Sequence, residues 1–491
     1  MQLLLSIDLG TSGVKAVVID LMGHLLATGT QPYPMDTPQV GWAEQSPVGW
    51  WQATIVAVRQ ALAQVNGSVA AIGLSGQMHG TVLLDRSGEP LGQAIIWADQ
   101  RSVDEVQTIE TTLGLERLRQ VGTRPATGFM GATLLWIKRH QPERLEQARV
   151  CLLPKDYLRY QLTGELATDV TDASATGLFD IRRRQWATEL IAQLGLPEAL
   201  LPPVLEPNTI VGTLTAAAAA ALGLAPNVPV VAGCADQVAQ SIGSGLLTAG
   251  QVSITLGSGG QVFAPLTQPY TDPALAIHTF CHAPQDQWYL LGAMLTAGLS
   301  LRWLRDFLGW QDQPDAFDRL SALAASVPAG AEGLLYLPYL AGERSPLMDP
   351  LARGALVGLT LRHSQGHVAR AVMEGVAFAL RHILETMQPL GVNPSEIWAA
   401  GNGLRSSVWR QIVADVLNRP LLMLPDAERT GIGAALLAGL GVGLYPDYPS
   451  LQAIVTQPST PTAPSLNAAE YDDGYARFIR AYPALKGISA P

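Results

Sequence analysis

The stretch SIDLGTSG, residues 6 to 13, places a carboxylate, Asp8, between an apolar run and a turn that carries two glycines. The run before it, residues 2 to 7, has the length and composition of a buried β-strand, and VKAVVID after the glycines predicts a second strand. Asp8 therefore stands where a strand enters a tight turn. Either it caps the turn, as Asp often does, or it faces a ligand that the turn holds.

The same pattern returns about half a chain later. The segment QVSITLGSGGQVFAP, residues 251 to 265, aligns with LLLSIDLGTSGVKAVV, residues 3 to 18, and sets Thr255 opposite Asp8. Two strand–turn–strand units in register predict a duplicated α/β domain. We expect a boundary near residue 245, with one domain over 1–245 and a second over 246–491. The segment from about 102 to 200 is predicted to be mostly helical.

Length, charge and cysteine content limit the class of protein. A chain of 491 residues is too long for one ordinary core, and its net charge of −10, with no block of Lys and Arg, argues against nucleic-acid and anionic-membrane surfaces. The apolar run at 215–235 is broken by Pro226 and Pro229, which predicts no membrane span. The three scattered cysteines, which are Cys151, Cys234 and Cys281, favour a reducing cytoplasm.

The glycine turns have an obvious chemical use. Successive backbone N–H groups converge in such a turn and form a nest that binds phosphate oxygens. Two facing turns from two domains can grip a polyphosphate from both sides, and a carboxylate beside one turn suits the hydrated Mg²⁺ that accompanies ATP. We therefore expect Asp8 to face this metal, directly or through water.

Two further side chains stand at strand ends. Asp236, in GCADQVAQ, follows an apolar strand and opens a helix, so it is either an ordinary helix N-cap or a general base facing a cleft. His79 lies in the loop between Gly76 and Gly80. A lone histidine is commonly structural, but a glycine-bracketed loop favours ligand contact. With Met78 it offers an apolar and a hydrogen-bonding surface to a small polyol.

Taken together, these motifs resemble the FGGY family of carbohydrate kinases over nearly the whole chain. The resemblance is carried by SIDLGTSGVKAVVID, GWAEQSPVGWW, GLSGQMHG, IIWADQRS, TLGSGG, GAMLTAGLSLRWLRD and AGERSP. The most specific match is GALVGLTLRHSQGHVARAVMEG, residues 354 to 375. The resemblance implies an α/β fold of two duplicated actin-like (ribonuclease H-like) ATPase domains with an interdomain cleft. The sugar side lies in the first domain and the ATP side in the second.

The resemblance also implies roles for single residues. Asp236 corresponds to the catalytic base and contacts the sugar with Met78, His79 and Gln237, while Asp8 is the acid on the Mg²⁺ side. The ATP-binding positions are Thr11, Ser12, Gly13, Gly257, Ser258, Gly298, Gly401 and Asn402. The implied reaction is ATP-dependent phosphorylation of a pentulose, with D-xylulose to D-xylulose 5-phosphate favoured by the GQMHG loop. The implied partners are the sugar and ATP, with a homodimer possible.

Three departures from the family pattern keep alternatives open. Gln237 stands where these kinases usually have Asn, which sets the sugar-side amide one methylene further out. Asn402 replaces the middle glycine of a glycine-rich turn, and Thr133 replaces a common lysine. The alternatives are therefore a kinase for D-ribulose or another polyol, or a sensor of sugar or nucleotide that has lost phosphoryl transfer.

Overall fold

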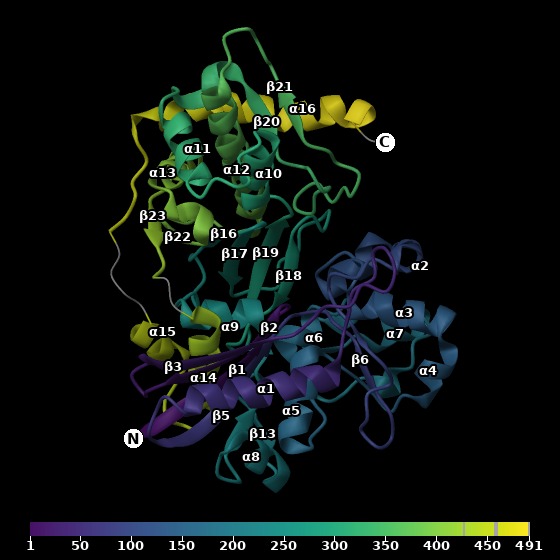
Figure 1. The fold of residues 1–491 in the computed structure, drawn as a ribbon. Helices are drawn as coiled ribbons and strands as arrows, with labels where there is room; N and C mark the ends of the chain where they lie inside the picture. The colour runs from purple at the N-terminus through teal and green to yellow at the C-terminus, as the bar shows by residue number, and fades with distance from the viewer. Residues whose placement is uncertain (426–427, 456–459, 490–491) are drawn as a thin grey trace.

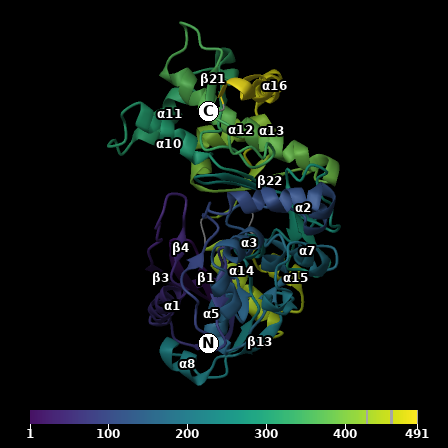
Figure 2. The ribbon, with the colours of Figure 1, turned by 90° about the vertical axis from the view of Figure 1, so that its right-hand side faces the viewer.

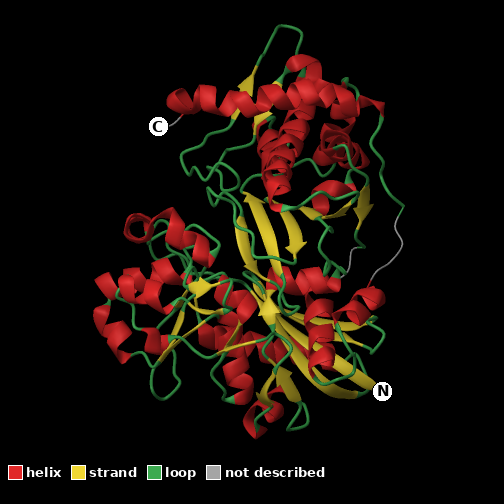
Figure 3. Cartoon of the chain, turned by 180° about the vertical axis from the view of Figure 1, so that it is seen from behind, coloured by secondary structure: helices red, strands yellow, loops and turns green. Residues whose placement is uncertain are grey.

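Two β-sheets, one in each half of the chain, form the frame of the computed structural model, which describes residues 1–425, 428–455 and 460–489 (Figures 1 and 3). The first sheet contains β13 (Ile210–Thr213), β14 (Pro229–Val231), β5 (Ser68–Gly76), β1 (Gln2–Leu9), β2 (Gly13–Ile19) and β3 (Leu25–Pro32), in that order, with β15 (Cys234–Ala235) beside β5. The second contains β18 (His278–Cys281), β19 (Trp288–Met294), β17 (Gly260–Leu266), β16 (Ser253–Leu256), β22 (Ile397–Ala400) and β23 (Leu421–Met423).

The strands that carry the two glycine turns occupy equivalent positions. Strand β1 pairs antiparallel with β2 and parallel with β5, while β16 pairs antiparallel with β17 and parallel with β22. Asp8 and Thr255 are each the second-last residue of their strand, opposite Lys15 and Gln261 respectively. The two halves thus share one strand arrangement, as the sequence repeat predicts.

Strand β1 is buried on both faces, and its alternation decides where Asp8 points. The side chains that pack with helix α1 (Pro47–Leu62) are Leu3, Leu5, Ile7 and Leu9. On the other face, Leu4 packs with helix α14 (Arg429–Gly441), and Ser6 Oγ donates a hydrogen bond of 2.7 Å to the Gly431 carbonyl oxygen. Because strand side chains alternate, Asp8 lies on the α14 face.

The helices cover the sheets and form a side lobe. Helices α1, α5 (Pro154–Thr163) and α8 (Ala216–Leu222) contribute to one core, while α2 (Val103–Val121), α3 (Met130–His140), α4 (Pro142–Gln147) and α7 (Thr188–Gln193) build the lobe at the right of Figure 1. The second half contains α10 (Gly298–Phe307), α11 (Ala316–Ala325), α12 (Gln365–Met387), α13 (Ser407–Leu417) and α16 (Tyr471–Ser489). The predicted helical content of residues 102 to 200 is confirmed.

Two helices near the end of the chain return to the first sheet, before α16 packs again with the second half. Helices α14 and α15 (Tyr448–Val455) share a core with β1 and with α9 (Asp236–Gly243), and both lie in the lower half of Figure 1. Figure 2 shows the two halves stacked one above the other. An ion pair of 2.7 Å joins Lys15 Nζ to Glu428 Oε2, just before α14. The boundary near residue 245 stays a prediction.

Two other expectations concerned the cysteines and the absence of a membrane span. Cys151, Cys234 and Cys281 are free and buried. Within the described ranges, every helix is too short or too polar to cross a membrane.

Candidate active site

Three parallel strands bring the predicted sugar-side residues to one edge of the first sheet. Leu9 at the end of β1 pairs with Gly76 at the end of β5, and Gly76 pairs with Ala235 at the end of β15. The first glycine turn, the His79 loop and Asp236 follow these strand ends directly. Parallel strands end at a common edge, which is where ligands bind in open α/β sheets. The structure therefore brings Asp8, His79 and Asp236 to the same edge.

Asp8 and Asp236 are buried carboxyls, and the charge of Asp8 acts on Asp236. In each residue, the Oδ1 atom is buried without a hydrogen-bond partner. Burial is the main cause that raises the pKa of Asp8 to about 6, with the nearby Lys15 acting in the opposite direction. Burial, and then the charge of Asp8, raises the pKa of Asp236 to about 7. The Asp236 carboxyl can therefore gain or lose a proton near neutral pH.

The position of Asp236 in its helix excludes one of the two interpretations of this residue. The N-cap of α9 is Ala235, and Asp236 is the first helical residue, with no side-chain cap at this helix. The carboxyl is thus not the cap that the sequence also permitted. Its location at a sheet edge, with a buried and unpartnered oxygen, is typical of a functional carboxyl.

His79 is held in a strained and fixed orientation. Its φ is 73°, in the left-handed region, and its Nδ1–H donates a hydrogen bond of 2.7 Å to the Ala175 carbonyl oxygen. The ring stacks on Phe129 with centroids 3.9 Å apart. Burial lowers its pKa to about 3, so the ring is neutral and its Nε2 is an acceptor. Phe129 is the N-cap of α3, the helix that carries the buried Thr133.

Met78, near α9, and Gln237, within it, differ in their surroundings. Met78 is only 6% exposed and belongs to the core cluster that includes Ala235 and Val238. Gln237 lines a small cavity whose other wall comes from the second sheet and includes Thr255. Gln237 thus lies between the two halves of the molecule, whereas Met78 is mostly part of the core.

In the second half, Gly257, Ser258 and Gly298 form one hydrogen-bonded unit. The Gly298 N–H donates to the Gly257 carbonyl oxygen at 2.9 Å, and the N–H groups of Ala297 and Leu299 donate to the Ser258 carbonyl oxygen at 2.9 and 3.0 Å. A Cβ atom on Gly298 would lie 2.5 Å from the Gly257 oxygen. Only glycine permits this approach, so the start of α10 packs directly on the turn after β16.

Gly401 reaches the same place from the neighbouring strand. It follows β22, whose Ala400 pairs with Thr255 of β16. Its φ is 101°, and a Cβ atom there would lie 2.4 Å from the Leu256 carbonyl oxygen. Asn402 is exposed and begins a short 3₁₀ helix, η4 (Asn402–Arg405). The predicted ATP-side glycines of the second half therefore meet around the end of β16.

The first glycine turn is supported by two side chains that belong to quoted motifs but were given no role from the sequence. Gln45 Nε2 donates to the Thr11 carbonyl oxygen at 2.7 Å, and Trp97 Nε1 donates to Thr11 Oγ1 at 2.9 Å. Within the turn, the Gly10 N–H donates to the Gly13 carbonyl oxygen at 3.1 Å. Ser12 is exposed at the tip. Thr11, Ser12 and Gly13 thus form a closed turn next to Asp8.

The residues present fit a magnesium ion that arrives with a polyphosphate. Among the residues that the structure describes, no cluster of three or more His, Cys, Asp or Glu side chains could hold a metal by itself. Asp8 nevertheless offers one buried, unpartnered oxygen. This suits Mg²⁺, which commonly takes one or two carboxylates and receives its other ligands from phosphate and water.

Two features of the site were given no role from the sequence. Arg344, in AGERSP, is close enough for its positive charge to contribute to the low pKa values of His79 and His278. A buried ionic cluster surrounds Lys155 and is joined to the chain next to Asp236. The charged residues of the cluster all lie between 155 and 172, but the backbone groups that it contacts, at Ala232 and Ala235, are distant in sequence.

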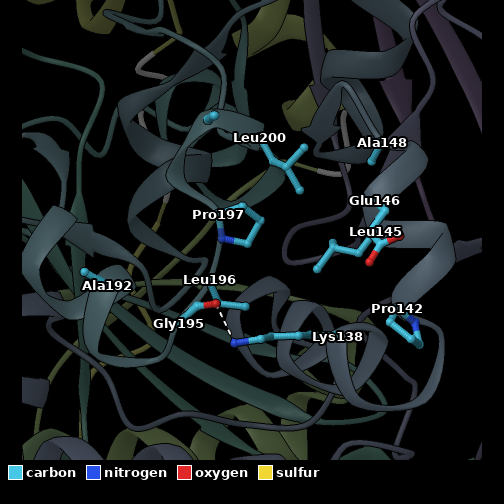
Figure 4. Close-up of a pocket in the computed structure, with 11 residues that line it drawn as sticks. Lys138, Pro142, Leu145, Glu146, Ala148, Ala192, Gly195, Leu196, Pro197 and Leu200 are labelled. Atoms are coloured by element: carbon cyan, nitrogen blue, oxygen red, sulfur yellow. Dashed lines mark hydrogen bonds between the residues drawn. The ribbon is translucent and has the colours of Figure 1, made fainter.

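A wide hollow lies away from these residues. It is formed in the side lobe by α3, α4 and the segment 192–200, and Figure 4 shows Lys138 Nζ reaching the Gly195 carbonyl oxygen across its floor, at 2.6 Å. None of its lining residues is a predicted site residue. This hollow is therefore separate from the predicted site.

Comparison with known proteins places this architecture in a class of sugar-phosphorylating enzymes. The N-terminal domain model of the FGGY family of carbohydrate kinases matches residues 3–243, and the C-terminal domain model matches residues 252–442. The chain belongs to this family. It has the family's two-domain, actin-like ATPase fold and is a carbohydrate kinase.

Individual relatives agree with this assignment. The chain is 38% identical over 442 residues to a xylulose kinase of Escherichia coli, covering 88% of this chain and 89% of that protein. A crystal structure of xylulose kinase from Rhodospirillum rubrum superposes with a TM-score of 0.93 at 30% identity, over 99% of each chain. A gluconate kinase from Lactobacillus acidophilus gives a TM-score of 0.95 at 28% identity, also over 99% of each.

Proposed function

We propose that this protein transfers the γ-phosphoryl group of ATP to the 5-hydroxyl of D-xylulose. The observation that carries the proposal is the Asp236 carboxyl, which has a pKa of about 7 and an unpartnered Oδ1 at the sheet edge shared with His79. The names of the Escherichia coli and Rhodospirillum rubrum relatives support the choice of sugar.

In this reaction Asp236 is the general base. Its carboxylate accepts the proton of the 5-hydroxyl while the hydroxyl oxygen forms a bond to the γ-phosphorus and the bond to ADP breaks. A base works best when its pKa lies near the operating pH, as the value of about 7 for Asp236 does. The remaining acceleration comes from positioning and charge stabilisation, because phosphoryl transfer needs little covalent help from the protein.

The other predicted residues divide between the two substrates. His79 Nε2 accepts a hydrogen bond from a sugar hydroxyl, and Met78 and Gln237 complete that side. The two glycine turns, Gly298 and Gly401 bind the phosphates and the nucleotide, with Asn402 at the rim. Asp8 holds Mg²⁺, directly or through water, and the ion when bound neutralises charge on the phosphate oxygens.

Gln237 is the reason to consider other phosphoryl acceptors. Its side chain is longer than the usual Asn, and it is the departure from the family pattern on the sugar side. D-ribulose differs from D-xylulose only at C3, and the similarity to a gluconate kinase shows that this fold is shared by kinases named for different sugars. A sensor without transfer activity is the remaining alternative. The presence of Asp8, Asp236 and both glycine turns favours an active kinase over this alternative.

The test is ADP release measured over D-xylulose, D-ribulose, gluconate and glycerol. We expect D-xylulose to exceed D-ribulose in kcat/KM by roughly 10- to 100-fold, because a misdirected hydrogen bond costs about 1–3 kcal/mol. His79→Ala should narrow that gap, whereas His24→Ala, at an exposed histidine of the first half, serves as the control. Preference for another acceptor would overturn the sugar assignment, and sugar binding without ADP release would favour the sensor.

The proposed setting follows from the cysteines and the charge. Three free, buried thiols favour a reducing compartment, and we place the protein in the cytoplasm. With a net charge of −10, the proposed partners are the sugar and ATP. Assembly into a homodimer stays a prediction that a solution mass measurement would check.

A further inference from the structure

Five charged side chains are fully buried behind the Asp236 loop. They are Lys155, Asp156, Arg159, Asp169 and Asp172. Lys155 Nζ lies 2.6 Å from a carboxylate oxygen of Asp156, 2.6 Å from one of Asp169 and 3.2 Å from one of Asp172. Arg159 Nη1 lies 2.7 Å from Asp156 Oδ1. Three carboxylates thus share two cations in the interior of the first half.

Stability alone does not account for such a cluster. Removing a charged group from water costs several kcal/mol, and a buried ion pair often contributes no more stability than apolar side chains of the same volume. Burial also raises the pKa of Asp172 well above its usual range, in spite of the neighbouring Lys155. A cluster of this cost suggests a role in fixing the geometry of whatever it contacts.

Its contacts lead to the segment that ends in Asp236. Arg159 Nη1 donates to the Ala232 carbonyl oxygen at 2.9 Å. Three residues further on, the Ala235 N–H donates to Thr171 Oγ1 at 2.9 Å. The cluster therefore holds both ends of the short connection 232–235, and Ala235 is the residue immediately before the proposed base.

The Thr171 hydroxyl is a donor toward Asp169 and an acceptor toward Ala235. It donates its only proton to Asp169 Oδ1, which also accepts the Thr171 N–H at 2.8 Å. The hydroxyl oxygen is then left as an acceptor, which is what the Ala235 N–H requires. Asp169 is itself held by Lys155 Nζ through its other oxygen. One chain of contacts thus runs from the Lys155 ammonium through Asp169 and Thr171 to the backbone beside Asp236.

We propose that Thr171, oriented by Asp169 and Lys155, is a positioning residue for Asp236. The inference rests on the proposed role of Asp236 as the base. The N-cap of α9 has no side-chain cap of its own, so the Thr171 hydroxyl fixes the backbone from which the Asp236 carboxyl projects. A displacement of about 1 Å in a reacting group can lower the rate about 100-fold, so a single hydrogen bond at this point controls turnover.

The test compares Thr171→Val, which removes the hydroxyl with little change in shape, with Thr171→Ser, which retains it. The matched control is Thr54→Val, which removes an equally buried hydroxyl that donates at 2.8 Å to the Trp50 carbonyl oxygen within α1. We expect Thr171→Val to lower kcat for D-xylulose at least about tenfold with little change in KM for ATP. Serine should restore most of kcat, and Thr54→Val should leave it near the original value.

The outcomes separate this inference from the proposed function. If Asp236→Ala abolishes turnover while Thr171→Val and Thr54→Val have equal kcat values, the positioning role is wrong and the base stands. If Asp236→Ala keeps its turnover, the base assignment itself fails. Should Thr171→Val not fold, Thr171→Ala replaces it, and a kcat for Thr171→Ala equal to that of Thr171→Ser would overturn the proposal.

Discussion

The turns after β1 and β16 occupy the same place in two sheets of the same design, yet they differ in chemistry. The first has Asp8 beside it, opposite Lys15, and Asp236 follows β15, which lies on the other side of β5 from β1. The second has Thr255 in the position of Asp8, and it is closed by Gly298 and Gly401. In the proposed function, the first half therefore supplies reactive side chains, and the second half supplies a backbone cradle for phosphates. Substitutions that remove a side chain should therefore lower activity most in the first half. Substitutions that add a Cβ atom should lower activity most in the second half.

The largest effect is expected at Asp236. Asp236→Ala removes the proposed base and should lower kcat by roughly 10²- to 10⁴-fold, the range typical of general base catalysis. The matched control is Asp318→Ala, at an exposed carboxylate in the first turn of α11, where only the favourable interaction with a helix N-terminus is lost. Steady-state kinetics and thermal unfolding of both variants measure this. A folded Asp236→Ala protein with near-normal kcat would reduce Asp236 to a structural residue.

A smaller effect is expected at the turn after β16, in the second half. Gly298→Ala places a Cβ atom 2.5 Å from the Gly257 carbonyl oxygen, so the turn after β16 must shift. Overpacking of this kind costs about 1–3 kcal/mol, and we expect KM for ATP to rise about tenfold while KM for the sugar changes little. The control is Gly487→Ala in α16, where a Cβ atom meets nothing within 4 Å. Equal ATP affinity in both variants would separate Gly298 from the nucleotide site.

Much of this comparison was accessible from the sequence, because it depends on local patterns. Alternation in LLLSIDL and the glycines after it place Asp8 at a strand end beside a turn, and the repeat at 251–265 predicts the second turn. His79 and Asp236 follow strands of the same kind. Parallel strands with a shared edge then bring these residues together without further information.

What the sequence could not provide was contact between distant segments. Thr171 and Ala235 are joined by a hydrogen bond across 64 positions of the chain, and Ser6 contacts Gly431 across 425. No periodic pattern specifies such a pairing. Burial and then the charge of Asp8 raise the pKa of Asp236, and both depend on β1, β5 and β15 lying side by side, so the raised pKa of the proposed base is a property of the fold.

This influence of Asp8 on Asp236 leads to the smallest predicted effect, a shift in pH dependence. Asp236 must be ionised to accept a proton, so kcat/KM for the sugar should fall as the pH drops below about 7. Because the negative charge of Asp8 contributes to the raised pKa of Asp236, Asp8→Asn should lower that pKa. The acidic limb of the profile should then move to lower pH by about one unit or less, even though the maximal rate falls. Profiles measured at one fixed concentration of free Mg²⁺, with Asp318→Asn as the control, would show this shift. An unmoved limb in Asp8→Asn would mean that the titrating group is not Asp236 or that the two carboxyls act independently.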